Sequence, residues 1–495
     1  MASHPALLAW PAAATDEYGL ALWSAPAVEA ATGGNASADF EASGVAFDSR
    51  EVREGDLFVA LKGEQSDGHA YLDQAFARGA AAAIVDHAPT SLGDRPHVLV
   101  RDTSSALEGL GIAARARGDA QIVGVTGSAG KTGVKEALFA GLDRASRGKA
   151  HRSLKSYNNH VGVPLSLARM PARTRFGVFE MGMNHPGELS ALTRLVRPNV
   201  AIVTTIAPAH IGFFKDEAAI ADAKGEIFEG LVPGGTAIIP ADSPHFARLR
   251  DKAREHAAHV VAFGRSTHAQ VRLLDTIRAH NGGTLITADL GDRRICFTVA
   301  MAGEHWVDNA LAVIAAVRAV GADLGAAGLA LAEMEGLAGR GARHAIAATG
   351  GDGSGRALLI DESYNANPAS MRVTIEELGK TPARRRIAVL GAMKELGEAE
   401  DRYHAELAAP LAEAGIDRAV LVGEEMRSLA EALGKSGRGA LGKRIDVAHV
   451  ADAAGALALL EGEGPAGGDA ILVKGSNSVG LGAVVRALTA KGVSA

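Results

Sequence analysis

The chain has 495 residues, of which 47% are hydrophobic and 22% are charged, a composition typical of globular proteins. Its length is too great for one ordinary hydrophobic core and predicts about three domains. The net charge of −6, without any polybasic run, argues against nucleic acid as the main partner, and the single cysteine, Cys296, excludes an intrachain disulfide and fits a reducing compartment.

The first residues do not resemble a targeting signal. Residues 1–18 contain no Lys or Arg, and Pro5 and Pro11 interrupt their short apolar stretch, unlike a secretory signal. No apolar run approaches the ~20 residues that a membrane span needs. We therefore expect a cytoplasmic protein without a membrane span, and a monomer as its default oligomeric state.

Residues 1–119 are predicted to form a small α/β domain. Short apolar runs alternate with turns and with one stretch of helical character. The expected elements are strands at 45–49 and 57–61, a helix at 71–80 and a strand at 81–86.

Residues 120–340 alternate strands and helices, a pattern that indicates a parallel sheet with crossover helices. The segment 265–300 differs, because it holds short β-like runs at 284–290 and 296–301. The other expected elements are strands at 121–125, 176–181 and 200–206, and helices at 134–145 and 306–320.

Residues 341–495 are predicted to form a second α/β sheet of dinucleotide-fold type. A turn at 351–355 opens the region, and we expect strands at 357–363, 386–393, 417–423 and 470–476. The predicted class is therefore α/β with three domains: a small N-terminal domain, a central P-loop ATPase-like parallel-sheet domain, and a C-terminal Rossmann-like domain.

The strongest local signal is TGSAGKT at 126–132, between a predicted strand and a predicted helix. Such a loop binds phosphate through its backbone N–H groups and the positive helix end, Lys131 can reach the outer phosphates, and Thr132 can ligate magnesium. A full P-loop has Gly where this chain has Val125, so an ordinary strand-to-helix turn is the alternative. The predicted nucleotide-binding residues of the loop are Gly127, Ser128, Ala129, Gly130, Lys131, Thr132 and Gly133.

Two candidate metal ligands follow two predicted strands of the central region. Glu180 lies at the end of the strand 176–181, and His210 follows the strand 200–206 after a short turn. Parallel strands place their carboxyl ends at the edge that carries the phosphate loop. A carboxylate there can bind magnesium, although a solvated acid is an equal alternative, and His210 alone is more typical of a hydrogen-bonded loop histidine. Lys224, in a helical run, is on its own more typical of a solvent-facing lysine.

Six segments in the right order resemble the Mur ligase family, and the resemblance extends from about residue 20 to the end of the chain. SYNANP at 363–368 could by itself be a turn-rich loop, but in this context it favours the member that adds D-alanyl-D-alanine. The six matching segments are 47–69, 126–132, 157–167, the pair 179–189 and 206–214, 223–228, and 361–371.

The resemblance implies a function. An ATP-dependent ligase of this kind joins D-alanyl-D-alanine to UDP-N-acetylmuramoyl-tripeptide through an acyl-phosphate, in peptidoglycan precursor synthesis. The alternatives are a Mur-type ligase that adds diaminopimelate, lysine or glutamate, and a non-catalytic nucleotide-binding homologue.

The resemblance also implies roles for individual residues. Lys224 is similar to the family lysine that becomes carbamylated, and Arg340 to the arginine that reaches the phosphates. The implied catalytic residues are Lys131, Lys224, His210 and Arg340. The implied ligands of one or two magnesium ions are Thr132, Glu180, His210 and Lys224. Besides the loop, the implied ATP contacts are His305, Asn309, Arg340, Asp361, Tyr364, Asn365 and Pro368. The implied substrate contacts are Ser49, Arg50, Asn158 and Asn159.

Two departures from the family pattern are visible. The segment that usually reads KGSR is KGSN at 474–477, so Asn477 stands in the arginine position. The first ~18 residues lack an obvious family counterpart.

Overall fold

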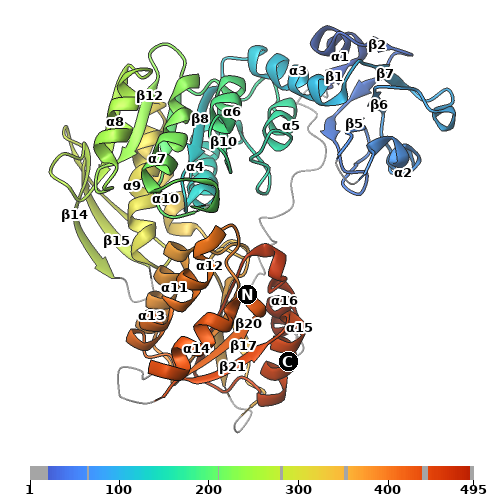
Figure 1. Cartoon of the computed structure of the whole chain (residues 1–495). Coiled ribbons are helices and arrows are strands. Elements are labelled where there is room, and N and C mark those ends of the chain that lie inside the picture. Colours follow the sequence, from blue (N-terminus) through green and yellow to red (C-terminus); the bar gives the residue numbers. More distant parts are fainter. Residues whose placement is uncertain are drawn as a thin grey trace.

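The computed structural model describes residues 21–63, 66–209, 211–278, 283–350, 355–436 and 444–490. Three large sheets follow one another along the chain, each with helices packed against it (Figure 1). In Figure 1 the first sheet is blue, the second lies in the part coloured from cyan to yellow, and the third is orange to red. This architecture confirms the predicted α/β class, whereas the limits of the domains stay predictions.

The first sheet has the strand order β2-β7-β6-β5-β4, in which β4 to β7 run parallel and β2 is antiparallel to β7. Leu57 and Val59 face a core shared with α1 and α3, and Phe58 faces a second core with α2. A ribbon of β1 (Trp23–Ser24) and β3 (Glu41–Ala42) lies beside it. The bounds are β2 Asn35–Ala36, β4 Gly44–Ala46, β5 Asp56–Val59, β6 Ala82–Val85, β7 His97–Leu99, α1 Ala25–Thr32, α2 Leu72–Ala77 and α3 Thr103–Ala116.

The strand predicted at 45–49 ends earlier, at Ala46. Asp48 terminates it, because its carboxylate accepts the Arg50 backbone N–H at 2.9 Å and its carbonyl accepts that of Glu51 at 2.9 Å. This local turn competes with further strand pairing.

The second sheet has the order β16-β15-β14-β13-β12-β11-β8-β10-β9. β8 to β14 are parallel, and the segment 265–300 extends the same sheet with an antiparallel hairpin. Helices α4, α9 and α10 pack on one face, and α5 to α8 on the other. The strands are β8 Gln121–Thr126, β9 Ala150–Arg152, β10 Phe176–Glu180, β11 Val200–Val203, β12 Thr236–Pro240, β13 His259–Gly264, β14 Val271–Arg278, β15 Thr284–Asp289 and β16 Arg294–Val299. The helices are α4 Lys131–Ser146, α5 Gly162–Ala168, α6 Glu188–Val196, α7 Glu217–Gly225, α8 Phe246–Arg254, α9 Glu304–Ala319 and α10 Leu324–Glu333.

The third sheet has the order β17-β18-β22-β19-β20-β21, parallel except for β17. Helices α11, α13 and α14 pack on one face, and α15 and α16 on the other. The strands are β17 Ala342–Ala347, β18 Arg356–Glu362, β19 Arg385–Gly391, β20 Arg418–Val422, β21 Asp446–Val450 and β22 Asp469–Lys474. The helices are α11 Pro368–Lys380, α12 Glu400–Ala405, α13 Ala408–Glu413, α14 Arg427–Ser436, α15 Ala453–Glu463 and α16 Gly482–Ala490. No helix among the described residues is long and apolar enough to cross a bilayer.

The third domain touches the edge of the central sheet through loops. The Gly212 N–H donates to Glu395 O at 3.1 Å, and the Asn367 amide donates to Ser128 O at 3.4 Å. At the end of the central domain, where it joins the third, the Arg340 guanidinium donates to Ser156 Oγ at 3.2 Å. Ser128 belongs to the phosphate loop. Gly212 lies in the segment 206–214, and Ser156 directly precedes the segment 157–167, two segments that were singled out from the sequence. The candidate site therefore lies between the central and third domains.

Candidate active site

The glycine loop joins the end of β8 to the start of α4. Gly127 has φ 150° and Gly130 has φ 82°, a conformation that side chains rarely adopt. A Cβ on Gly127 would lie 1.9 Å from Thr204 Oγ1, and one on Gly130 would lie 2.7 Å from Asn309 Oδ1. The loop therefore requires both glycines, and it ends at the amino terminus of a 16-residue helix, where free N–H groups favour an anion.

The loop that follows β11 holds the glycine loop in place. The Ser128 N–H donates to Thr205 O at 2.9 Å, and the Ser128 hydroxyl donates to Ala207 O at 2.9 Å. The Thr204 hydroxyl donates to Ala129 O at 2.5 Å. The two loops thus form one unit, while His210, predicted as a metal ligand, lies outside the described residues.

Lys131 begins α4 and folds back over the loop. Its Nζ donates to Gly127 O at 2.7 Å. Burial lowers the pKa of Lys131, the Glu180 carboxylate opposes this effect, and the Arg340 guanidinium adds to it. Two cationic groups therefore lie near the loop, where a phosphate would stabilise both.

Thr132 and Glu180 form a buried polar pair beside the loop, which the half-buried Asn158 joins. The Thr132 hydroxyl donates to Glu180 Oε2 at 2.8 Å, and Asn158 Nδ2 donates to Glu180 Oε1 at 2.8 Å. Glu180 ends β10, next to β8 in the sheet, and is 1% exposed. Hydroxyl and carboxylate oxygens are the ligands that Mg²⁺ prefers, so these residues fit a magnesium site. The alternative of a solvated strand-end acid is wrong.

Lys135, one turn after Lys131, was not singled out from the sequence. It is fully buried, and its Nζ donates to Ser153 O at 3.0 Å and to Lys155 O at 2.8 Å. Carboxylate oxygens of Glu136 and Glu180 lie 2.9 Å and 4.0 Å away. Lys135 therefore ties α4 to the segment 153–158, which carries Asn158.

Lys224 lies in the last turn of α7 and is 1% exposed. The solvent-facing alternative is therefore wrong. Within the described residues its Nζ has no hydrogen-bond or ion-pair partner. Burial, with a further contribution from the positive charge of Lys131, lowers the pKa of Lys224 well below its usual value. An amine in this environment favours its neutral, nucleophilic form.

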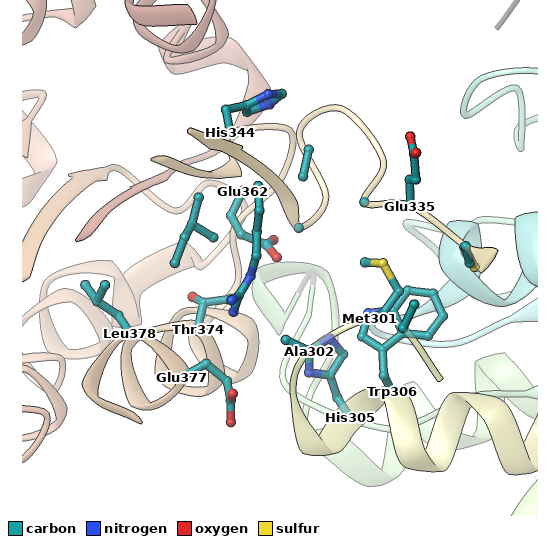
Figure 2. Close-up of a pocket in the computed structure, with 17 residues that line it drawn as sticks. Met301, Ala302, His305, Trp306, Glu335, His344, Glu362, Thr374, Glu377 and Leu378 are labelled. Carbon is teal, nitrogen blue, oxygen red and sulfur yellow. The ribbon is translucent and has the colours of Figure 1, made fainter. Parts of the chain in front are cut away.

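A cavity of about 520 Å³ opens between α9, β18 and α11 (Figure 2). Figure 2 shows His305 and Trp306 of α9 across from Glu362, Thr374 and Glu377 of the third domain. Burial lowers the pKa of His305 although both glutamates raise it, and its buried Nδ1 has no partner in the described chain. The lining combines apolar side chains such as Met301 and Trp306 with charged and polar groups, and polar groups that converge on a cavity can orient a small molecule.

Asn309, buried on α9, lies against the glycine loop rather than facing solvent. The ring of Trp306 is similarly close to Gly133, where a Cβ would lie 2.9 Å from the indole. Helix α9 and the glycine loop are therefore in direct contact, so residues of both can belong to one site.

The predicted third-domain residues lie around the connection between the two domains. The Asp361 carboxylate accepts the Gly339 N–H at 2.7 Å and the Ser363 hydroxyl at 2.6 Å, so it holds the connecting turn. The Arg340 guanidinium lies 4.2 Å from the centre of the Tyr364 ring, a cation–π contact. Asn365 is exposed, and Pro368 is the first residue of α11.

Two further residues of this region were not singled out from the sequence. Asn367 caps α11 and reaches Ser128 O. Lys474 ends β22, is 2% exposed, and donates to Asn365 O at 3.0 Å and to Glu362 Oε2 at 3.5 Å. The exposed Asn477, in the family's arginine position, lies in the 3₁₀ turn Asn477–Val479.

The predicted substrate residues are less closely grouped. Ser49 Oγ donates to Gln74 Oε1 at 2.7 Å, and the exposed Arg50 pairs with Asp48 at 2.7 Å. Asn158 donates to the Glu180 carboxylate, whereas Asn159 Oδ1 accepts the Gly162 N–H at 2.9 Å at the start of α5. The first domain meets the segment 153–158 through Glu51, which accepts the Tyr157 hydroxyl at 2.9 Å and pairs with Lys155.

Comparison with protein families gives three matches in chain order. The model described as the catalytic domain of the Mur ligase family matches residues 41–142, the Mur ligase middle domain matches 125–317, and the Mur ligase glutamate ligase domain matches 349–477. Together these matches include strands of all three sheets.

Individual relatives are similar over nearly the full chain. The UDP-N-acetylmuramoyl-tripeptide–D-alanyl-D-alanine ligase of Escherichia coli K12 is 35% identical, over 92% of this chain and 95% of its own. The ligase of the same name from Synechocystis is 33% identical, over 92% and 94%. Among solved structures, MurF from Acinetobacter baumannii has a TM-score of 0.79 and 28% identity, covering 95% of this chain and 99% of its own. The MurF ligase of Thermotoga maritima in complex with ADP has a TM-score of 0.72 and 26% identity, covering 90% and 97%.

Proposed function

The chain belongs to the Mur ligase family, and from this premise we propose that it joins D-alanyl-D-alanine to UDP-N-acetylmuramoyl-tripeptide with conversion of ATP to ADP and phosphate. The observation that supports this proposal best is the meeting of a two-glycine loop with the buried Thr132–Glu180 pair at one sheet edge. Named relatives with this activity, similar over more than nine-tenths of the chain, support the substrates.

The reaction needs two steps. A terminal carboxylate oxygen of the tripeptide attacks the γ-phosphorus of ATP, and ADP leaves. The amine of D-alanyl-D-alanine then attacks the acyl carbon, the amine loses its proton, and inorganic phosphate leaves as the amide forms. Lys131 and Arg340 offset the negative charge that would otherwise repel the attacking carboxylate.

Magnesium would be held by Thr132 and Glu180, with His210 and carbamylated Lys224 as further ligands of one or two ions, and it would neutralise phosphate charge. Lys224 supports this assignment because a buried amine, here with no counterion among the described residues, can add CO₂, which converts it to an anionic carbamate with release of a proton. The cavity lined by His305 would take the base of the nucleotide, and Asn309 would contact the nucleotide beside the glycine loop.

Each of the three domains would have a different role in binding the substrates. Residues 1–119, with Ser49 and Arg50, would bind the uridine nucleotide, residues 120–340 the ATP, and residues 341–495 would close over it through Asp361, Tyr364, Asn365 and Pro368. Closure would exclude water, which otherwise hydrolyses an acyl-phosphate. We place the reaction in the cytoplasm, on a monomeric enzyme.

The decisive experiment measures ADP release with UDP-N-acetylmuramoyl-tripeptide and a panel of amines. We expect release with D-alanyl-D-alanine, and not with diaminopimelate, lysine or glutamate, and the peptide product by mass spectrometry. Turnover with one of the single amino acids instead would favour a different Mur ligase. Nucleotide binding without ADP release would favour a non-catalytic homologue.

A further inference from the structure

Asn367 connects the third domain to the phosphate loop across 239 residues of sequence. It is 7% exposed and precedes α11, while its contact Ser128 is 4% exposed. Both ends of the side-chain amide are engaged. Oδ1 accepts the Ser370 N–H at 2.8 Å as the helix cap, and Nδ2 donates to Ser128 O at 3.4 Å.

The orientation of this amide follows from the cap. If its oxygen and nitrogen were exchanged, the NH₂ group would face the Ser370 N–H, and oxygen would face the Ser128 carbonyl. Both contacts would then be repulsive. The capping box fixes the side chain further, because the Ser370 hydroxyl accepts the Asn367 N–H at 3.0 Å.

The acceptor of this hydrogen bond, the Ser128 carbonyl, belongs to a part of the phosphate loop that further hydrogen bonds hold in place. The Ser128 N–H and hydroxyl are bonded to Thr205 and Ala207 of the loop that follows β11, which leaves its carbonyl for a partner from outside the central domain. On the other side, Lys474 holds the carbonyl of Asn365, two residues before Asn367. A short, fixed connection thus joins α11 to the phosphate loop.

We propose that Asn367 is a positioning residue that couples the placement of the third domain to the conformation of the phosphate loop, through the hydrogen bond from its side-chain amide to Ser128 O. This inference rests on the proposed ligase function. It assigns the coupling to Asn367 rather than to the exposed Asn365. Asn367 acts on the loop and not on the reacting atoms.

Substitutions can test the helix cap of Asn367 and its contact with Ser128 separately. Asn367→Asp keeps a good helix cap but places an oxygen against the Ser128 carbonyl. Asn367→Ser also caps, but it is too short to reach Ser128. Ser370→Ala is the matched control, because it removes the reciprocal bond of the capping box and leaves the amide contact in place.

In the full chain we expect the thermal midpoint of Asn367→Asp to stay within about 2 °C of the wild type. At pH 8 its kcat/KM for ATP should fall about 30-fold, and that of Asn367→Ser about tenfold. The Kd for ADP by calorimetry should rise about tenfold in both. Hydrogen exchange of the loop amides 127–131, measured without nucleotide, should become faster. For Ser370→Ala we expect kcat/KM for ATP, the Kd for ADP and the exchange rates of the loop amides to stay within about twofold of the wild type.

The contrast between stability and kinetics is the readout that a purely structural role would not give. A purely structural loss would lower the thermal midpoint together with kcat/KM. The carboxylate of Asn367→Asp, which stays ionised between pH 8 and pH 6, should instead lower kcat/KM at an unchanged thermal midpoint. Wild-type kinetics in Asn367→Asp, or an equal loss in Ser370→Ala, would overturn the inference. A wild-type protein that releases no ADP would instead overturn the proposed function.

Discussion

The Thr132 hydroxyl donates a 2.8 Å hydrogen bond to Glu180 Oε2, which joins the first turn of α4 to the end of β10. If this pair holds magnesium, Thr132→Val should remove one oxygen ligand with little change of shape. We expect the Mg²⁺ concentration for half-maximal ADP release to rise on the order of 10- to 100-fold. The control is Thr193→Val, because Thr193 also donates from a buried site, to Ile227 O at 2.7 Å. An unchanged Mg²⁺ requirement would contradict the assignment.

Lys131 and Lys135 lie one turn apart on α4, and their substitution should affect different properties. We expect a loss of activity for Lys131 and a loss of stability for Lys135. Lys135→Met leaves the carbonyls of Ser153 and Lys155 and the Glu136 carboxylate without their buried cation. Breaking such a network costs about 3–5 kcal/mol, so we expect a clearly lower thermal midpoint. Lys131→Met should keep its midpoint and lose ADP release by about 100- to 1,000-fold. Similar thermal midpoints for the two variants would contradict this division.

The phosphate loop could be predicted because its constraints are local. Two glycines between an apolar strand and a helix require little more than the chain itself, and the parallel-sheet rule placed Glu180 at the same edge. The hairpin β15–β16 was also visible as β-like runs. That it extends the central sheet depends on pairing between β13 and β14, which local pattern does not determine.

Lys224, Lys135 and Asn367 could not be placed from the sequence for a common reason. Each has the local pattern of a surface residue, a helix lysine or a turn asparagine, and each is buried only because another element packs over it. The Asn367 contact joins positions 239 residues apart, in different domains. Family resemblance identified Lys224 but not the other two.

The stacking of Arg340 on Tyr364 offers a graded test of the connection between domains. The guanidinium lies 4.2 Å from the ring centre and also donates to Ser156 Oγ at 3.2 Å. Tyr364→Phe keeps the aromatic face and should stay within about twofold of wild-type kcat/KM for ATP. Tyr364→Ala removes the face and should lose about 5- to 30-fold, equivalent to about 1–2 kcal/mol. Equal kinetics for the two variants would exclude the ring as the support of Arg340.

The buried amine of Lys224 leads to a prediction on CO₂ and pH. Because burial and Lys131 lower its pKa, the amine is neutral above that lowered value and becomes protonated only as the pH falls through it. Protein incubated with ¹³C-bicarbonate at pH 8 should therefore show a carbamate carbon resonance that weakens as the pH is lowered. Lys224→Ala should lack the resonance, whereas Lys135→Arg should keep it, because the Lys135 ammonium is already engaged by two carbonyls and Glu136. A resonance that persists in Lys224→Ala would assign the carbamate to another amine, and none in the wild type would leave Lys224 an unmodified base.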